Sequence, residues 1–142
     1  MDTAVTNHHM KGHPSIGTVG KKQFVVESKH AIDFTDGGMP PVLCTPWLIW
    51  FLEHAALEAL KPWLEQGEST VGLEIEVRHL APTPLGHSVT CMARIIQVED
   101  RRITFQVEAR DEMELIARGV HRRQVIRVEG FARRVQEKAP RR

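Results

Sequence analysis

Three polar side chains stand where the surrounding pattern predicts apolar ones, and together they suit hydrolytic chemistry. Thr45 opens the most apolar run of the chain, Glu53 lies inside that run, and His79 ends a strand-like alternation. An imidazole near its free pKa of about 6.5 can take a proton from a hydroxyl at neutral pH. A carboxylate can orient that imidazole or activate water. Sequence periodicity alone does not show that the three side chains meet.

Each of these residues also has a purely structural interpretation. Thr45 would be a helix N-cap, and His79 would be a hydrogen-bonded histidine of the core. Glu53 would be a buried carboxylate paired with Arg94 or Arg123. Other histidines compete for the role of base. His54 lies on the other side of the expected helix, and His121 shares a strand with neighbouring arginines, which makes it a ligand-contact candidate.

The apolar run predicts a helix from Thr45 to about residue 64. Threonine followed by Pro46 is typical of a helix start, because proline at the first helical position loses no hydrogen bond. Gly67 offers a left-handed cap beyond the other end. An interior proline at position 62 predicts a kink, or a new short turn carrying Trp63.

From residue 69 the apolar period changes from helical to alternating, which predicts strands joined by short polar turns. The expected strands are 23–26, 69–79, 88–98, 103–110 and 115–128, the last interrupted by Gly119. One long helix packed on an antiparallel sheet is an α+β fold. In 69–79, the residues expected to share the buried face are Val71, Leu73, Ile75, Val77 and His79.

The helix is apolar on all sides, so one face of one sheet cannot cover it. We expect the sheet to curl about the helix and a second subunit to cover the remainder, which predicts a homodimer. The segment 33–41 is dense in turn residues and leads into the helix, so we expect a loop that acts as a lid over the helix start.

The bulk composition favours a single domain in a reducing compartment. The chain has 142 residues, a net charge of +1 and two cysteines, too few for a disulfide framework. We expect a disordered arm over 1–20, one domain over 21–132 and a basic tail over 133–142. No secretory or membrane-spanning stretch appears, so a cytoplasmic protein without membrane contact is expected.

Metal and nucleic-acid binding are both disfavoured. The N-terminal histidines His8, His9 and His13 have no carboxylate or cysteine cluster at ligand spacing around them. The segment 118–142 carries nine Lys or Arg against two Glu. Its positive charge indicates either a solvent-exposed strand edge with a frayed C-terminal tail or contacts with the phosphates of a ligand. No aromatic side chains interleave those charges as a platform for stacked bases, so no nucleic-acid partner is expected.

Several motifs resemble the small acyl-CoA thioesterases of the fluoroacetyl-CoA thioesterase family. The motifs are Leu43-Cys44-Thr45-Pro46 through Glu53-His54-Ala55, Ser69-Thr70-Val71-Gly72, Val77 to Gly86, and Gly119-Val120-His121-Arg122-Arg123. The resemblance covers about residues 41–137. It implies a hotdog fold, in which an antiparallel sheet wraps a long helix, and a homodimer with acyl-CoA lying between the subunits.

The resemblance also implies site residues. Thr45, Glu53 and His79 match the family's catalytic threonine, glutamate and histidine in order and spacing. Gly72 matches a position where a missing side chain lets the thioester approach the backbone, and Arg123 matches one suited to the CoA side. With His121, these residues make up the expected substrate-binding set.

The sequence thus predicts a thioesterase that hydrolyses a short or compact acyl-CoA without a metal or cofactor, CoA being part of the substrate. The alternative is a non-catalytic acyl-CoA binding or sensing module on the same fold. The segment 36–41, Asp-Gly-Gly-Met-Pro-Pro, lacks the aromatic residues that the fluoroacetyl-specific family member carries over its acyl pocket. This difference argues against selectivity for a fluorinated acyl group.

Overall fold

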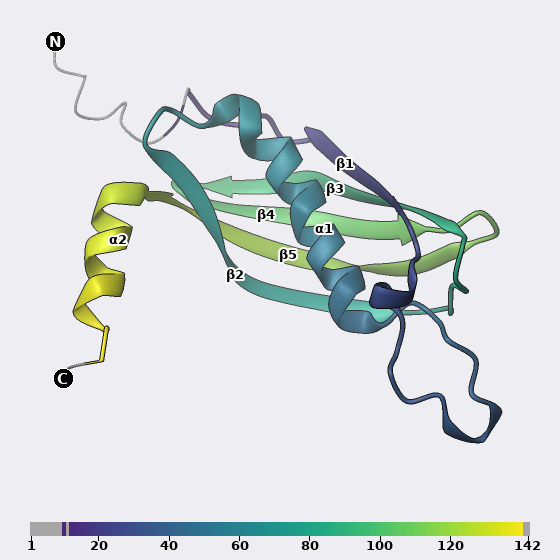
Figure 1. Ribbon diagram of the computed structural model, residues 1–142. Coiled ribbons are helices and arrows are strands. Elements are labelled where there is room, and N and C mark those ends of the chain that lie inside the picture. Colours follow the sequence, from purple (N-terminus) through teal and green to yellow (C-terminus); the bar gives the residue numbers. More distant parts are fainter. Residues whose placement is uncertain (1–9, 11, 141–142) are drawn as a thin grey trace, which may run out of the picture.

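The computed structural model describes residues 10 and 12–140, and within them one long helix lies against one face of an antiparallel sheet (Figure 1). The strands are β1 (Val19–Val25), β2 (Glu68–His79), β3 (Ser88–Glu99), β4 (Arg102–Arg110) and β5 (Leu115–Arg127). The long helix is α1 (Thr45–Leu60), and a second helix, α2 (Val128–Glu137), follows β5. The α+β architecture expected from the sequence is confirmed.

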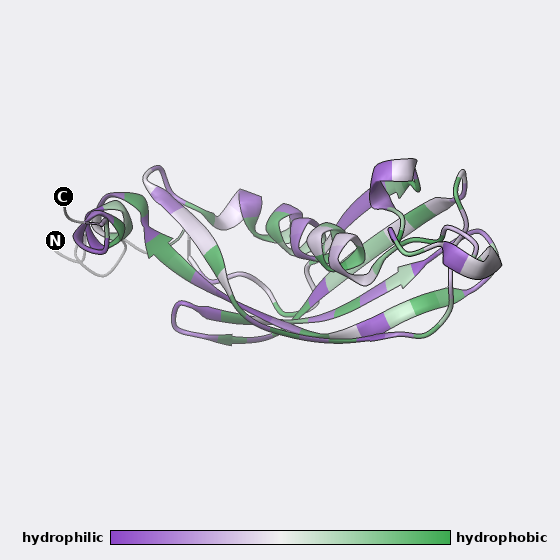
Figure 2. Cartoon of the chain, turned by 60° about the horizontal axis from the view of Figure 1, so that its bottom comes forward, coloured by the Kyte–Doolittle hydropathy of each residue, from purple (hydrophilic) through white to green (hydrophobic). Residues whose placement is uncertain are grey.

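The strand order is β1-β3-β4-β5-β2, so β1 and β2 are the edges of the sheet. The sheet curls, and α1 lies on its concave side (Figure 2). Leu48 and Leu52 of α1 are fully buried there, as are Ile95 of β3 and Phe105 of β4. Burying each such side chain contributes about 1.5–3 kcal/mol, so this layer fixes the helix against the sheet.

The helix α1 ends earlier than the apolar run suggests. It stops at Leu60 rather than near residue 64, and a 3-10 turn, η4 (Lys61–Trp63), follows. Pro62 lies in that turn, where it has no backbone N–H to continue the α-helical ladder. The expected short turn carrying Trp63 is therefore confirmed, and the expected helix end is corrected by four residues.

The alternation expected in β2 is interrupted by a β-bulge. The pairing of β2 with β5 shifts register between Gly72 and Glu74, which places Leu73 at the irregularity. Leu73 is 49% exposed, whereas Thr70 is buried. The expectation that Val71 and Leu73 share the buried face with Ile75 is therefore wrong, because one extra residue reverses which side chains point inward.

The first strand begins earlier than expected, at Val19, inside the segment 1–20 expected to be a disordered arm. Gly17 also donates its backbone N–H to the carbonyl oxygen of Ile95, which ties this segment to β3. Gly20 lies so close to α1 that a Cβ would overlap the backbone of Ala55 and Ala59. Residues 1–9 and 11, including the histidines at 8 and 9, lie outside the described residues.

The basic tail expected over 133–142 is helical as far as Glu137, because α2 spans Val128–Glu137. The sequence signal is an apolar spacing of three and then four residues, at Val128, Phe131 and Val135. All three side chains are more than 40% exposed. No helix in the described part of the chain is long and apolar enough to cross a bilayer.

Candidate functional site

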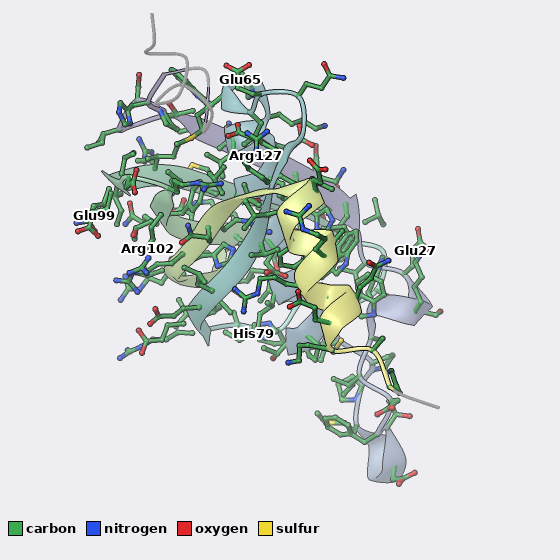
Figure 3. All side chains as sticks on the ribbon, turned by 90° about the vertical axis from the view of Figure 1, so that its left-hand side faces the viewer. Glu27, Glu65, His79, Glu99, Arg102 and Arg127 are labelled. Atoms are coloured by element: carbon green, nitrogen blue, oxygen red, sulfur yellow. The ribbon has the colours of Figure 1, made fainter. Side chains whose placement is uncertain are left out.

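Thr45 and His79 meet at the start of α1. The Oγ1 of Thr45 lies 2.8 Å from the Nδ1 of His79, which comes from the last residue of β2. Figure 3 labels His79 at the end of β2 and Arg127 at the end of β5, where the chain enters α2. Arg127 pairs with Glu68, the first residue of β2, so the two labelled residues lie at opposite ends of this strand pair. Cys44, not Thr45, is the N-cap residue of α1. The hydroxyl of Thr45 is therefore directed at the imidazole rather than serving as the helix cap.

The surroundings of His79 favour its neutral ring. Desolvation by burial lowers the pKa of His79 below its usual 6.5, so the neutral form dominates at pH 7. The Nε2 atom is buried without a hydrogen-bond partner among the described residues. If Nδ1 accepts the threonine proton, Nε2 carries a hydrogen that still requires an acceptor.

A cavity of about 320 Å³ opens beside this pair. Its lining comes from the segment before α1, the start of α1 and the end of β2 with the residues that follow: Ile32, Val42, Leu43, Cys44, Thr45, His79, Leu80, Ala81 and Pro82. Apolar side chains dominate this lining. A larger groove of about 640 Å³ is lined by Arg78, Gln106 and Arg118 among others, and none of the candidate catalytic residues reaches it.

Glu53 takes part in a different cluster, halfway along α1. Its Oε2 accepts a hydrogen bond from Nη1 of Arg123 at 3.2 Å. Arg123 also donates from Nε to Oγ1 of Thr70 and from Nη2 to the Thr70 carbonyl oxygen, at 2.9 and 3.2 Å. The pairing of Glu53 with an arginine, one of the alternatives open at the sequence level, is present, and the partner is Arg123 rather than Arg94.

Arg123 and His121 occupy the interior rather than the surface. Arg123 is 5% exposed and His121 is 1% exposed. Burial lowers the pKa of Arg123, and the carboxylate of Glu53 opposes that effect. Both residues are expected to contact substrate. In this chain, the side-chain nitrogens of both residues form hydrogen bonds with other protein groups. Thr70 joins the same cluster; the sequence placed it in a motif of the resemblance but gave it no role.

Gly72 borders this cluster directly. A Cβ at position 72 would lie 2.7 Å from Oε2 of Glu53, closer than carbon and oxygen atoms can approach without a shift. The missing side chain therefore makes room for the carboxylate of Glu53. The resemblance implies that Gly72 lets the thioester approach the backbone; in the structure, its neighbour is Oε2 of Glu53.

The two parts of the candidate site are separated within one chain. Thr45 and Glu53 are eight positions apart in the helix, which corresponds to about 12 Å along the axis of α1. The polar contacts of Glu53 within the described residues go to Arg123 and His121, not to His79. Residues 10 and 12–140 contain no group of three or more His, Cys, Asp or Glu placed to hold a metal ion.

Comparison with known proteins agrees with this architecture. The family model described as fluoroacetyl-CoA-specific thioesterase matches residues 25–129. The fluoroacetyl-CoA thioesterase of Streptantibioticus cattleyicolor is 40% identical over 101 residues, covering 71% of this chain and 73% of that relative.

Solved structures give the same result. A structure of fluoroacetyl-CoA thioesterase superposes with a TM-score of 0.82 at 33% identity, over 89% of this chain and 98% of the other. A thioesterase superfamily member from Thermus thermophilus superposes with a TM-score of 0.79 at 30% identity, over 88% and 95% of the two chains. A hot-dog-like protein from Thermanaerovibrio acidaminovorans gives 0.80 at 26% identity, over 89% and 94%. The chain has the hotdog fold and belongs to the fluoroacetyl-CoA-specific thioesterase family.

Proposed function

We propose that this protein is a homodimeric thioesterase that hydrolyses a short or compact acyl-CoA to the free acid and CoA. The observation that carries the proposal is the 2.8 Å contact between Oγ1 of Thr45 and Nδ1 of His79 at the edge of an apolar cavity. A hydroxyl with an imidazole base in hydrogen-bond contact is the arrangement that acyl transfer requires.

Two routes use this pair. In the covalent route, His79 takes the proton of Thr45 while Oγ1 attacks the thioester carbonyl carbon. The C–S bond then breaks, the CoA sulfur receives the proton from the imidazolium, and water hydrolyses the acyl-threonine. In the direct route, Thr45 positions a water molecule, and His79 takes a proton from this water as its oxygen attacks the same carbon. The C–S bond then breaks, and the CoA sulfur receives that proton from the imidazolium. Unpaired backbone N–H groups at the start of α1 favour the negative oxygen that develops in either route.

We assign Glu53 to the site formed with the other subunit. One helix cannot bring Glu53 and Thr45 to the same carbonyl, because about 12 Å of helix lies between them. The edge of β2 is unpaired in the described chain, and the side of α1 next to Glu53 carries Trp50, which stacks on His54 and is 42% exposed. An antiparallel dimer through β2 would cover that side, and it would offer the partner's carboxylate to the open Nε2 of His79 or to the attacking water.

A subunit-mixing experiment tests this composite site. Thr45→Ala and Glu53→Gln should each inactivate both sites of their own homodimer. A mixed dimer has one doubly altered site and one intact site, so randomly mixed subunits should recover about a quarter of the wild-type activity. Each variant mixed with itself serves as the control. If the mixture stays as inactive as its parents, Thr45 and Glu53 do not act across the interface.

The acyl group is expected to be small but not specifically fluorinated. The lid includes a 3-10 turn, η3 (Asp36–Gly38), followed by Met39, and it has no aromatic side chain from Asp36 to Pro41. Assays of acetyl-, propionyl-, butyryl- and fluoroacetyl-CoA hydrolysis, in which release of the CoA thiol is measured, would test both activity and acyl preference. If CoA esters bind but survive, the protein is an acyl-CoA binding module instead.

A further inference from the structure

The hydrogen bonds around His121 define its protonation state. Its Nδ1 lies 2.8 Å from the carbonyl oxygen of Glu74, and a carbonyl oxygen can only accept, so Nδ1 carries a hydrogen. Its Nε2 lies 3.1 Å from Nη1 of Arg123, and a guanidinium can only donate, so Nε2 carries none. This pair of partners fits the neutral Nδ1–H imidazole and excludes the imidazolium.

The electrostatic surroundings agree with a neutral ring. Desolvation lowers the pKa of His121 below 6.5, the positive charge of Arg123 lowers it further, and the Glu74 carbonyl and Glu53 oppose these effects. The groups that face the ring are Glu53 from α1, Arg123 from β5, and the Glu74 backbone from β2, while Phe105 of β4 stacks against it. The side chain of Glu74 pairs instead with Arg122. The 3.9 Å approach of Nε2 to Glu53 is thus not an ion pair.

Arg123 Nη1 consequently has two acceptors, Glu53 and His121, while Thr70 accepts from its Nε and Nη2. These contacts fix the plane of the guanidinium. Both of the close polar contacts of Glu53 in the described part of the chain involve Oε2. The Oε1 atom is left open to a water molecule or to a group of the other subunit.

We propose that His121 is a positioning residue for Glu53: it holds the guanidinium of Arg123, which in turn holds one carboxylate oxygen, and Gly72 leaves the space that this oxygen occupies. This inference rests on the catalytic role of Glu53 in the proposed function. The positioning role replaces the direct substrate contact expected of His121. It also gives the β-bulge after Gly72 a purpose, because the bulge presents the Glu74 carbonyl oxygen to the imidazole ring.

Substitutions at His121 test the effect on the reaction. His121→Leu should lower kcat by about 10- to 100-fold, since the carboxylate loses its fixed position, and should change KM by less than about twofold. His121→Gln retains an acceptor for Nη1 and should recover most of kcat. His30→Leu removes another buried imidazole, outside this cluster, and should leave kcat within about twofold of the wild type.

A matched pair of glycine substitutions tests the space beside Glu53. Gly72→Ala should lower kcat because a Cβ would displace Oε2, whereas Gly130→Ala, with no atom within 4 Å of the added Cβ, should have no effect. Nitrogen-15 NMR of the imidazole gives a readout that does not depend on activity. His121 should be protonated at Nδ1 only, from pH 7 down to at least the pH at which surface histidines have become cationic.

The outcomes separate this inference from the proposed function. If Glu53→Gln loses activity but His121→Leu keeps kcat within about twofold of the wild type, the positioning role is wrong while the proposed function stands. A His121 ring protonated at Nε2 at pH 7 would also overturn the positioning role. If Glu53→Gln itself retains full activity, the catalytic role of Glu53 fails, and the positioning role fails with it, whatever the NMR result.

Discussion

At the residue scale, burial favours the neutral form of His79, the base that we propose for Thr45. The imidazole lies beside an apolar cavity, and its desolvation favours the neutral form that can accept the threonine proton. The imidazole of His121 is fully buried and lies between fixed partners, the Glu74 carbonyl oxygen and the guanidinium of Arg123. We therefore propose different roles for the partly buried His79 and the fully buried His121, because their hydrogen-bond partners differ.

The lowered pKa of His79 predicts the direction of the pH dependence. A base works only when it is unprotonated, so activity should rise with pH through a pKa below 6.5 and be at its plateau by neutral pH. The pH dependence of kcat/KM for the best acyl-CoA substrate measures this limb. His79→Ala should reduce the plateau by about 10²- to 10⁴-fold and remove the limb. A limb centred above pH 7 would contradict the assignment.

At the element scale, two segments around the mouth of the cavity are held by specific contacts. The turn after β2 is anchored by Thr83, whose buried hydroxyl donates to Oδ2 of Asp111 at 2.9 Å and whose carbonyl oxygen accepts from the N–H of Leu43. Desolvation alone would raise the pKa of Asp111, but hydrogen bonds from Met113, Thr83 and Glu114 outweigh it and lower that pKa. The turn therefore connects the end of β2 to the segment that precedes α1.

Thr83→Val should destabilise the fold by about 1–3 kcal/mol, because the valine cannot donate to Asp111 while the volume of the side chain is kept. Urea unfolding measures this free-energy change. Thr18→Val removes an exposed hydroxyl that bonds to the Ser15 carbonyl, and its cost should be within about 0.5 kcal/mol. If both variants unfold at the same urea concentration, the Thr83–Asp111 contact does not anchor the turn.

The loop over 33–41 is expected to act as a lid, and this supports a prediction about acyl selectivity. Met39 is 43% exposed at the end of η3 and is not among the residues lining the cavity beside Thr45, so it would border the space for the acyl group only with the loop closed over the helix start. Met39→Phe should narrow that space and reduce kcat/KM for butyryl-CoA more than for acetyl-CoA, by about 10-fold or more. Met113→Phe, at an exposed residue in the turn between β4 and β5, is a control that should leave the ratio unchanged. Equal losses for both substrates would show that the lid does not border the acyl group.

The elements themselves were largely predictable, because their patterns are local. Thr45-Pro46 and the apolar run predicted the start of α1, and alternation predicted β3, β4 and β5. The bulge after Gly72 was not predictable, since a single extra residue leaves the alternation of β2 intact in the sequence. The partner of Glu53 is Arg123 rather than Arg94. This contact joins residues 70 positions apart in the sequence, and no local pattern encodes it.

At the scale of the whole molecule, the described chain leaves a sheet edge and one side of α1 uncovered. β2 is an edge strand of 12 residues, and an unpaired edge of that length invites pairing with another chain. Leu73 on that edge and Trp50 on α1 are both more than 40% exposed. A second copy related by a two-fold axis would cover these features and would complete the composite site proposed above.

Dimerisation through β2 predicts a specific defect. Leu73→Lys places a charge on the edge strand, so it should weaken the dimer and lower activity together, without unfolding the chain. Light scattering coupled to size-exclusion chromatography over micromolar concentrations measures the mass. Ile96→Lys changes an exposed apolar residue of β3, an interior strand of the sheet, and should leave the mass unchanged. A wild-type protein that is strictly monomeric while active would contradict this account.

The central claim is that Thr45, activated by His79, carries out hydrolysis of an acyl-CoA. The most direct test is the rate of CoA thiol release from a panel of short acyl-CoA esters, compared between the wild type and Thr45→Ala, with Thr18→Ala as the exposed-threonine control. The expected result is turnover of at least one ester by the wild type and the control, and a kcat about 10²- to 10⁴-fold lower for Thr45→Ala. Hydrolysis of none of the esters, or full activity in Thr45→Ala, would contradict the claim.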